Sequence, residues 1–350
     1  MSTARPSRRK TGCRRPRRPS RPRERGATDR GEAVAHRLAL VTLGATSVLI
    51  LLGGLVTNTG AALAVPDWPS TFGYNMLLFP WARMAGGILY EHSHRLAGAV
   101  VGLLTLGLAA ALWPAGGRLR WLGVTAAVTV VAQGVLGGLR VVLLEDTLAI
   151  VHGSLAQAFF ALLSAIALLS SRAAAVPLRG ADPAVRRVAF AAAAAVYLQI
   201  VFGALLTHAG WLWLHVGGAL AVFAVVPSVT ARLRGTGDPV AAPIARVLLV
   251  LLGLQLLLGV GTFLARFTAI WIPGGQTTLL VLPLAHRLVG SLILGAVVVL
   301  ALRVSGHPRS AAASRVPAMT LDVMASGERG RGAQELGHPQ SAAASRTPLQ

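Results

Sequence analysis

The 350-residue chain carries little charge, since only 13% of its residues are Asp, Glu, Lys or Arg. That is about half the share found in a soluble domain. Hydrophobic residues make up 54%, and so few charged side chains cannot cover the surface of a water-soluble protein. This excludes an ordinary cytosolic enzyme. Cysteine is nearly absent too, because Cys13 alone excludes an intramolecular disulfide and a thiolate metal cluster.

The net charge of +21 is concentrated at one end of the chain. Residues 1–37 hold 13 Lys or Arg and three acids, so they contribute +10. A basic stretch of this kind could bind nucleic acid or anionic lipid. The apolar remainder favours a polytopic membrane protein whose residues 1–35 form a disordered, basic cytoplasmic tail, with membrane lipid and not nucleic acid as the partner.

Long apolar runs predict an all-α protein with eight transmembrane helices, since each run reaches the roughly 20 residues that span a bilayer. The first run is too long for a cleaved secretory signal. The runs are 36–57, 92–113, 119–140, 149–170, 188–207, 212–231, 244–264 and 282–303. Arginines concentrate in alternate loops, which predicts a multi-pass protein of the plasma membrane with both termini in the cytoplasm.

An internal repeat divides the membrane part into two pseudo-symmetric four-helix bundles. GGLVTNTG (53–60) corresponds to GALLTHAG (203–210), and QGVLGG (133–138) corresponds to QLLLGVG (255–261). We therefore predict an N-terminal bundle over 36–170, a cytoplasmic linker over 171–187 and a C-terminal bundle over 188–303. Residues 304–350 form a second disordered tail, in which the segment 306–317 recurs at 337–348.

Four histidines occupy equivalent places near the outer starts of the even-numbered spans: His94, His152, His215 and His286. Ionisable side chains at membrane depth are costly and point to function. Two facing imidazoles can ligate a haem iron, so we predict two sites, one per bundle. Interfacial histidines bonded to loop carbonyls are the structural alternative. A zinc cluster is disfavoured because its usual cysteine ligands are missing.

Glu91 distinguishes the two halves. It lies three residues before His94 and about 60° from it around the helix, whereas the corresponding positions of the other even spans carry Ala149, Leu212 and Pro283. A carboxylate beside one haem position alone predicts that the N-terminal half performs chemistry. Arg95 and Arg287 follow two of the histidines and could bind haem propionates or reach the membrane interface.

The first outer loop, residues 61–87, is long and rich in Trp and Pro. We expect it to fold over the outer end of the N-terminal bundle, with Trp68 and Trp81 as interfacial anchors.

Six segments together resemble the haem A synthase family: GGLVTNTGAALAVPDWPSTFG (53–73), EHSHRLAG (91–98), HGSLAQ (152–157), QIVFGALLTHAG (199–210), LHVGGAL (214–220) and HRLVG (286–290). The resemblance implies a membrane oxidoreductase that oxidises the C8 methyl of haem O to a formyl group, giving haem A for terminal oxidases. It further implies that Glu91 is the catalytic acid, that His94 and His152 hold the substrate haem, and that His215 and His286 hold haem b.

The chain departs from many bacterial members of that family, which have two cysteines around PDWP. Val65 precedes the motif here, and Ser70 and Thr71 follow it, which indicates a subgroup without these cysteines. The alternative function is a membrane b-type cytochrome for electron transfer or quinol oxidation, and a transporter ranks last. The synthase reading implies haem O synthase and an unidentified electron donor as partners, and allows a homo-oligomer.

Overall fold

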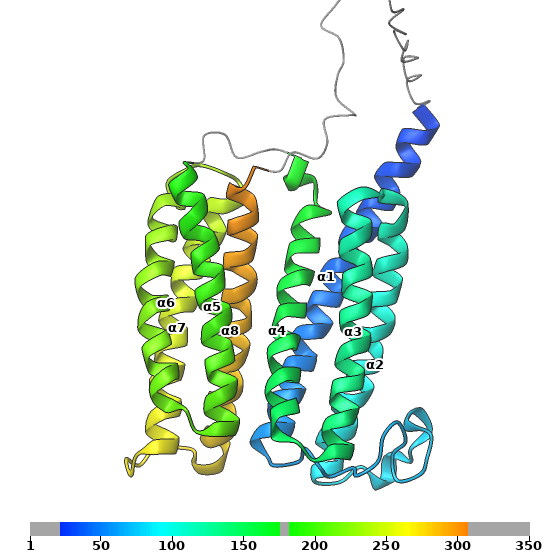
Figure 1. The fold of residues 1–350 in the computed structure, drawn as a ribbon, viewed down its shortest axis with the longest axis vertical. Coiled ribbons are helices and arrows are strands. Elements are labelled where there is room, and N and C mark those ends of the chain that lie inside the picture. Colours follow the sequence, from blue (N-terminus) through cyan, green and yellow to red (C-terminus); the bar gives the residue numbers. More distant parts are fainter. Residues whose placement is uncertain (1–21, 176–181, 307–350) are drawn as a thin grey trace, which may run out of the picture. The chain divides into compact units, whose positions relative to one another are not determined.

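The structure is a computed structural model that describes residues 22–175 and 182–306. Within these ranges, eight helices are long and apolar enough to cross a membrane, which confirms the predicted all-helical class (Figure 1). Their bounds are α1 Pro22–Asn58, α2 Gly87–Leu112, α3 Gly117–Leu143, α4 Asp146–Leu169, α5 Pro183–Ala209, α6 Leu212–Leu233, α7 Ala241–Phe267 and α8 Gly275–Val304.

Two separate apolar cores support the division into bundles. One core is built from α1–α4 around residues such as Leu108, Phe159 and Leu163. The other is built from α5–α8, around residues such as Val226 and Leu248. Helices α4 and α1 of the first bundle pack on α8 of the second, and α4 also contacts α5. Each bundle therefore has its own interior and the two share an interface.

Several helices are longer than the apolar runs predicted. Helix α1 begins at Pro22, inside the segment 1–35 that was predicted to be a tail, and its Arg, Ala and Glu residues are good helix formers. Helix α5 begins inside the predicted linker, because Asp182 caps it and Pro183 occupies its first turn. Residues 1–21, 176–181 and 307–350 lie outside the described residues, and so does the duplicated segment.

The repeated TNTG and THAG motifs are helix ends. Gly60, just beyond α1, has φ +70°, and Gly210 caps α5 with φ +75°. This left-handed conformation suits glycine, so the motif stops both helices in the same way. Helix α5 turns directly into α6, whereas α1 is followed by an irregular loop, residues 59–86, with the short 3₁₀ turns Met76–Leu78 and Trp81–Arg83. The loop is the main difference between the halves at this end.

A buried ion pair closes the opposite end of the C-terminal bundle. Arg303, at the end of α8, donates from Nη2 (2.7 Å) and Nε (3.1 Å) to the carboxylate of Asp238 in the α6–α7 connection. Its Nη1 donates to the carbonyl of Ala173, 2.7 Å away. Burial would raise the pKa of Asp238, but the hydrogen bonds from Arg303 and the backbone outweigh it and lower that pKa.

Candidate functional site

The four predicted histidines meet in two pairs. In the N-terminal bundle the rings of His94 (α2) and His152 (α4) have centroids 6.5 Å apart and planes inclined by 76°. In the C-terminal bundle the rings of His215 (α6) and His286 (α8) are 6.2 Å apart and inclined by 67°. The structure therefore forms the two intra-bundle pairs that the repeat predicted, with nearly the same geometry.

Each ring packs against a glycine of the preceding odd-numbered helix. A Cβ atom at Gly53 or Gly259 would lie 2.9 or 3.0 Å from the Cε1 atom of His94 or His286. At Gly137 and Gly203 the corresponding distance is 3.3 Å. Real Cβ atoms almost never come as close as 3.0 Å, so the missing side chains let the imidazoles lie against the backbone. The four glycines define the depth at which the histidines sit.

At three of the four glycine–histidine contacts, a glutamine four residues before the glycine also contacts the histidine. Gln133 donates from Nε2 to the carbonyl of His152 (3.1 Å), and Gln199 to that of His215 (2.9 Å). The Nε2 atom of Gln255 lies 3.1 Å from a ring nitrogen of His286. Sequence reasoning missed these roles, although the signal was present as QGVLG, QIVFG and QLLLG. The fourth site has LILLG (49–53), with a leucine in the glutamine position.

The side chains at both sites fit an iron porphyrin. One buried ring nitrogen of His94, His152 and His286 has no hydrogen-bond partner in the described part of the chain. Nitrogens of this kind could bind the iron of a haem, and the short distance between the two rings of each pair would let both reach one iron. Four glycines of the helices that carry the histidines have no atom within 4 Å of an added Cβ and could leave room for a macrocycle: Gly98, Gly102, Gly153 and Gly217.

Three other glycines of these helices, Gly218, Gly290 and Gly295, serve packing. A Cβ at Gly295 (α8) would lie 2.8 Å from Ser164 Oγ of α4, so this glycine allows the two bundles to approach. Gly218 lies beneath the side chains of Gln199 and Phe202, and Gly290 beneath Gln255. Their small size is therefore explained by neighbouring side chains.

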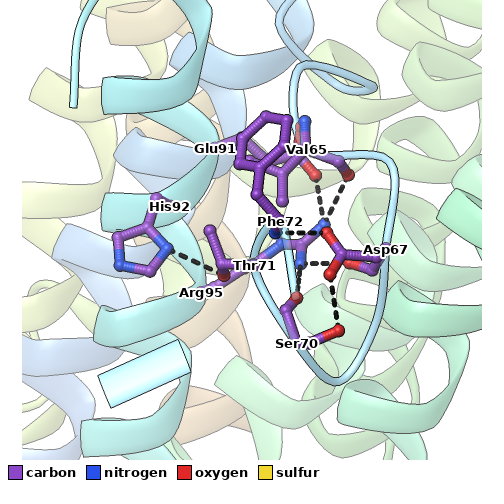
Figure 2. Close-up of polar contacts among 8 residues, drawn as sticks. All are labelled: Val65, Asp67, Ser70, Thr71, Phe72, Glu91, His92 and Arg95. Atoms are coloured by element: carbon purple, nitrogen blue, oxygen red, sulfur yellow. Dashed lines mark hydrogen bonds and ion pairs between the residues drawn. The ribbon is translucent and has the colours of Figure 1, made fainter. Parts of the chain in front are cut away.

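Glu91 is buried, with 4% of its surface exposed, and is held by the first outer loop. Its Oε2 accepts a hydrogen bond from the backbone N–H of Val65 (2.9 Å), and its Oε1 accepts one from Arg95 Nη2 (2.7 Å). Arg95 also donates to three loop carbonyls (Figure 2), those of Val65 (2.8 Å), Asp67 (2.7 Å) and Ser70 (3.1 Å). The carboxylate and guanidinium of α2 thus bind the loop as a unit.

Asp67 organises the same loop from within. Its carboxylate accepts hydrogen bonds from the backbone N–H groups of Phe72 (2.7 Å) and Gly73 (2.9 Å) and from the hydroxyl of Ser70. Burial would raise the pKa of this carboxyl, but these hydrogen bonds outweigh it and lower the pKa to about 2. The PDWP segment is therefore an ordered turn built around an ionised carboxylate, with no need for a covalent cross-link.

Two further contacts fasten the loop over the N-terminal site. The indole of Trp68 lies on Gly138 of α3, where a Cβ would be 2.2 Å from its Cδ2 atom. Gly138 directly follows Gly137, on which the ring of His152 rests. On the other side, Thr71 Oγ1 is 3.2 Å from Nδ1 of the buried His92 (Figure 2). The loop thus covers the N-terminal bundle as the sequence predicted, and Trp68 packs on a helix, whereas Trp81 is 76% exposed.

The two arginines that follow histidines behave differently. Both terminal nitrogens of Arg95 donate two hydrogen bonds each, which leaves only Nε–H for any other group. Arg287 of α8 reaches out of its own bundle, and its Nη1 would lie 3.0 Å from a Cβ at Gly54 of α1. The propionate contact predicted for each arginine stays a prediction, and the geometry leaves more room for it at Arg287.

Residues 36–212, just over half of the chain, match the COX15-CtaA family, described as cytochrome oxidase assembly protein. The chain belongs to this family. COX15-CtaA proteins are haem A synthases, so the chain is a multi-pass membrane oxidoreductase of cytochrome oxidase assembly with a haem substrate. The curated proteins include no match to it.

The family match covers one site more fully than the other. It includes the first outer loop, Glu91, His94 and His152, and ends at residue 212, before His215 and His286. The match thus contains the whole N-terminal bundle that the loop covers. The roles of the individual histidines, and the subgroup without cysteines, rest on the arguments that follow.

Proposed function

We propose that the N-terminal bundle is where haem O is converted to haem A, by oxidation of its C8 methyl to a formyl group. In this proposal His94 and His152 hold the substrate haem, and Glu91 is the catalytic acid. One observation carries the assignment. Glu91 is buried and bound by the loop 59–86 that covers this bundle (the covering loop), and the corresponding positions of the other even helices carry no carboxylate.

The chain's own residues prepare the N-terminal site in two ways. The loop, fastened by Arg95 and Trp68, excludes water from one side of the bundle, and a dry site strengthens electrostatic interactions. Glu91 accepts hydrogen bonds at both oxygens, which suits a carboxylate. It can stabilise positive charge that develops at the methyl carbon, or relay the protons that oxidation releases.

We propose that His215 and His286 hold haem b. When bound there, haem b would supply one-electron redox chemistry to the membrane protein. Gln199 and Gln255 fix the orientation of the two imidazoles, as outer-shell partners of metal ligands commonly do. The C-terminal bundle has no loop comparable to residues 59–86 among its described residues, which suits a resident group better than an exchanging substrate.

The topology proposed from the arginine distribution places both termini in the cytoplasm and the covering loop outside the plasma membrane. Haem O synthase is the expected source of substrate, and an electron donor completes the reaction. Neither partner surface is identified by the sequence. We also propose that the chain belongs to a subgroup of the family that lacks the two loop cysteines. The turn around Asp67 supports this, because it orders the PDWP segment by hydrogen bonds and needs no cysteine.

The decisive experiment measures haem A in membranes that contain this chain together with a haem O synthase, by extraction and chromatography. Glu91→Gln keeps the size of the side chain and should abolish haem A formation. Asp182→Asn is the matched control, because asparagine caps a helix as well as aspartate does and the residue lies at the far end of α5. Unchanged haem A in Glu91→Gln would refute the assignment of Glu91.

Haem content separates the two bundles in the same membranes. His215→Ala or His286→Ala should lose the stable haem, while Glu91→Gln should retain it. If only His94→Ala or His152→Ala lost it, the roles of the bundles would be reversed. A wild type that holds two stable haems and produces no haem A would favour the b-type cytochrome instead.

A further inference from the structure

A polar cavity of about 340 Å³ lies between the two bundles, at the end of the molecule where the covering loop is found. Both bundles line it through equivalent members of the internal repeat. Thr57 and Asn58 come from the TNTG motif of α1, and Thr207 and His208 come from the THAG motif of α5. The cavity therefore lies where the two repeats face each other.

The cavity is in register with all four histidine sites. On each odd-numbered helix, one of the cavity residues lies three, four or seven positions after the glycine on which a histidine ring rests. These glycine–cavity pairs are Gly53–Thr57, Gly137–Arg140, Gly203–Thr207 and Gly259–Arg266. Such spacings keep both residues on one helical face, so the cavity lies about one to two turns outside the imidazoles, on the same side of each helix.

Two guanidinium groups in this cavity have no short-range partner among the described residues. Within the described ranges, the guanidinium groups of Arg140 and Arg266 form no ion pair and donate no hydrogen bond. The Nδ2 atom of Asn58 is buried and also lacks an acceptor among those residues. Glu145 and Asp146 line the cavity as well, and Asp146 interacts electrostatically with Arg140 at longer range. Both carboxylates and Arg266 are exposed, so solvent weakens these interactions, whereas Arg140 is half-buried.

We infer that this cavity receives porphyrin carboxylates, with Arg140 and Arg266 as their ligands, and so forms a shared acid-binding site between the two haem sites. The inference rests on the proposed function, because it takes both histidine pairs as porphyrin sites. Guanidinium groups suit carboxylates by charge and by their paired N–H donors. A porphyrin held by imidazoles at the depth of the glycines would direct its acidic edge toward the cavity.

The test compares a porphyrin with free carboxylates and the same porphyrin without them. Full-length protein in nanodiscs is titrated with protohaem IX and with its dimethyl ester, and the ratio of the two Kd values is measured. The variants are Arg140→Gln, Arg140→Lys and Arg266→Gln. Arg83→Gln is the matched control, since Arg83 is an exposed arginine of the outer loop that bonds Tyr74 and lies outside the cavity.

The wild type and Arg83→Gln should bind the diacid at least about tenfold more tightly than the ester, as expected for charge-assisted hydrogen bonds. The preference should fall to about twofold or less in Arg140→Gln, in Arg266→Gln or in both. Arg140→Lys should keep part of the preference that Arg140→Gln loses. Loss in Arg140→Gln alone assigns the cavity to the N-terminal porphyrin, and loss in Arg266→Gln alone to the C-terminal one.

Two results would overturn the inference: no preference for the diacid in the wild type, or the same preference in both glutamine variants. Neither outcome bears on haem A formation, which the Glu91 experiment measures separately. The failure of this inference is therefore distinguishable from failure of the proposed function.

Discussion

Replacing Gly138 by alanine tests whether the covering loop is needed at the N-terminal site. The new Cβ would lie 2.2 Å from Cδ2 and 2.3 Å from Cε2 of Trp68. Carbon atoms in contact are about 3.5–4.0 Å apart, so the rigid indole must move by more than about 1 Å. Overpacking costs about 1–3 kcal/mol. The better helix propensity of alanine acts equally with the loop open or closed, so it does not offset this cost. We expect loop closure to weaken by about 1–2 kcal/mol, or about 5- to 30-fold in the closed-to-open ratio.

Gly134→Ala is the matched control, because it makes the same change one turn earlier in α3, where no atom lies within 4 Å of an added Cβ. Trypsin cleavage after Arg83, in nanodiscs, reports loop opening. The Gly138→Ala protein should be cleaved about 5- to 30-fold faster than the wild type, and its haem A yield should fall, while Gly134→Ala should match the wild type in both. Equal cleavage rates in the two variants would show that the Trp68 contact does not hold the loop.

Three further predictions test the turn, the closing ion pair and the histidine seat. The pKa of Asp67 is lowered to about 2, so its carboxylate stabilises the turn fully at pH values above the usual pKa of 3.8, and this stabilisation is lost as the pH falls toward 2. Hydrogen exchange of residues 65–73, corrected for intrinsic rates, should show this transition. The variant Asp67→Asn should not show it. Arg303→Met leaves the carboxylate of Asp238 buried without its charged partner and should lower the free energy of unfolding, measured by thermal denaturation, by about 3–5 kcal/mol. Adding Asp238→Leu to this variant should restore part of the lost stability. An Arg303→Met protein as stable as the wild type would contradict the argument. Gly53→Ala should lower the haem content of the N-terminal site, while Gly44→Ala on the same helix, with open space around it, should not.

The fold was largely predictable because membrane spans are set by length and composition. Lipid offers no hydrogen bonds to the backbone, so each apolar run must be helical, and eight runs give eight helices. The ends were less predictable, because a helix continues beyond the apolar run when capping residues allow it. Asp182 and Pro183 begin α5 before its apolar run, and α1 extends back to Pro22 through residues with good helix propensity.

The histidine pairs were also predictable, because the repeat places equivalent residues at equivalent depths. The glutamines and glycines that support them were visible as three copies of one pattern, but only the structure shows that each pattern faces the histidine of the next helix. The covering loop could not be predicted in detail. Arg95 reaches carbonyls 25–30 residues earlier in the chain, and a backbone carbonyl carries no sequence signal.

The two bundles share one plan for holding imidazoles, so the differences between them indicate which one performs chemistry. In the N-terminal pair Gln133 supports His152, but Leu49 stands in the glutamine position at His94, and the carboxylate of Glu91 is added beside His94. The arginine that follows this histidine binds the loop, whereas its counterpart Arg287 reaches to Gly54 of the other bundle. A site that must admit a substrate and release a product benefits from a cover held by hydrogen bonds, which can open. A site that keeps its group benefits from ligands of fixed orientation, and Gln199 and Gln255 hold the two histidines of the C-terminal pair in place. The repeat therefore provides one scaffold twice, and the few differences around it support the proposal that exchange and catalysis belong to the first copy.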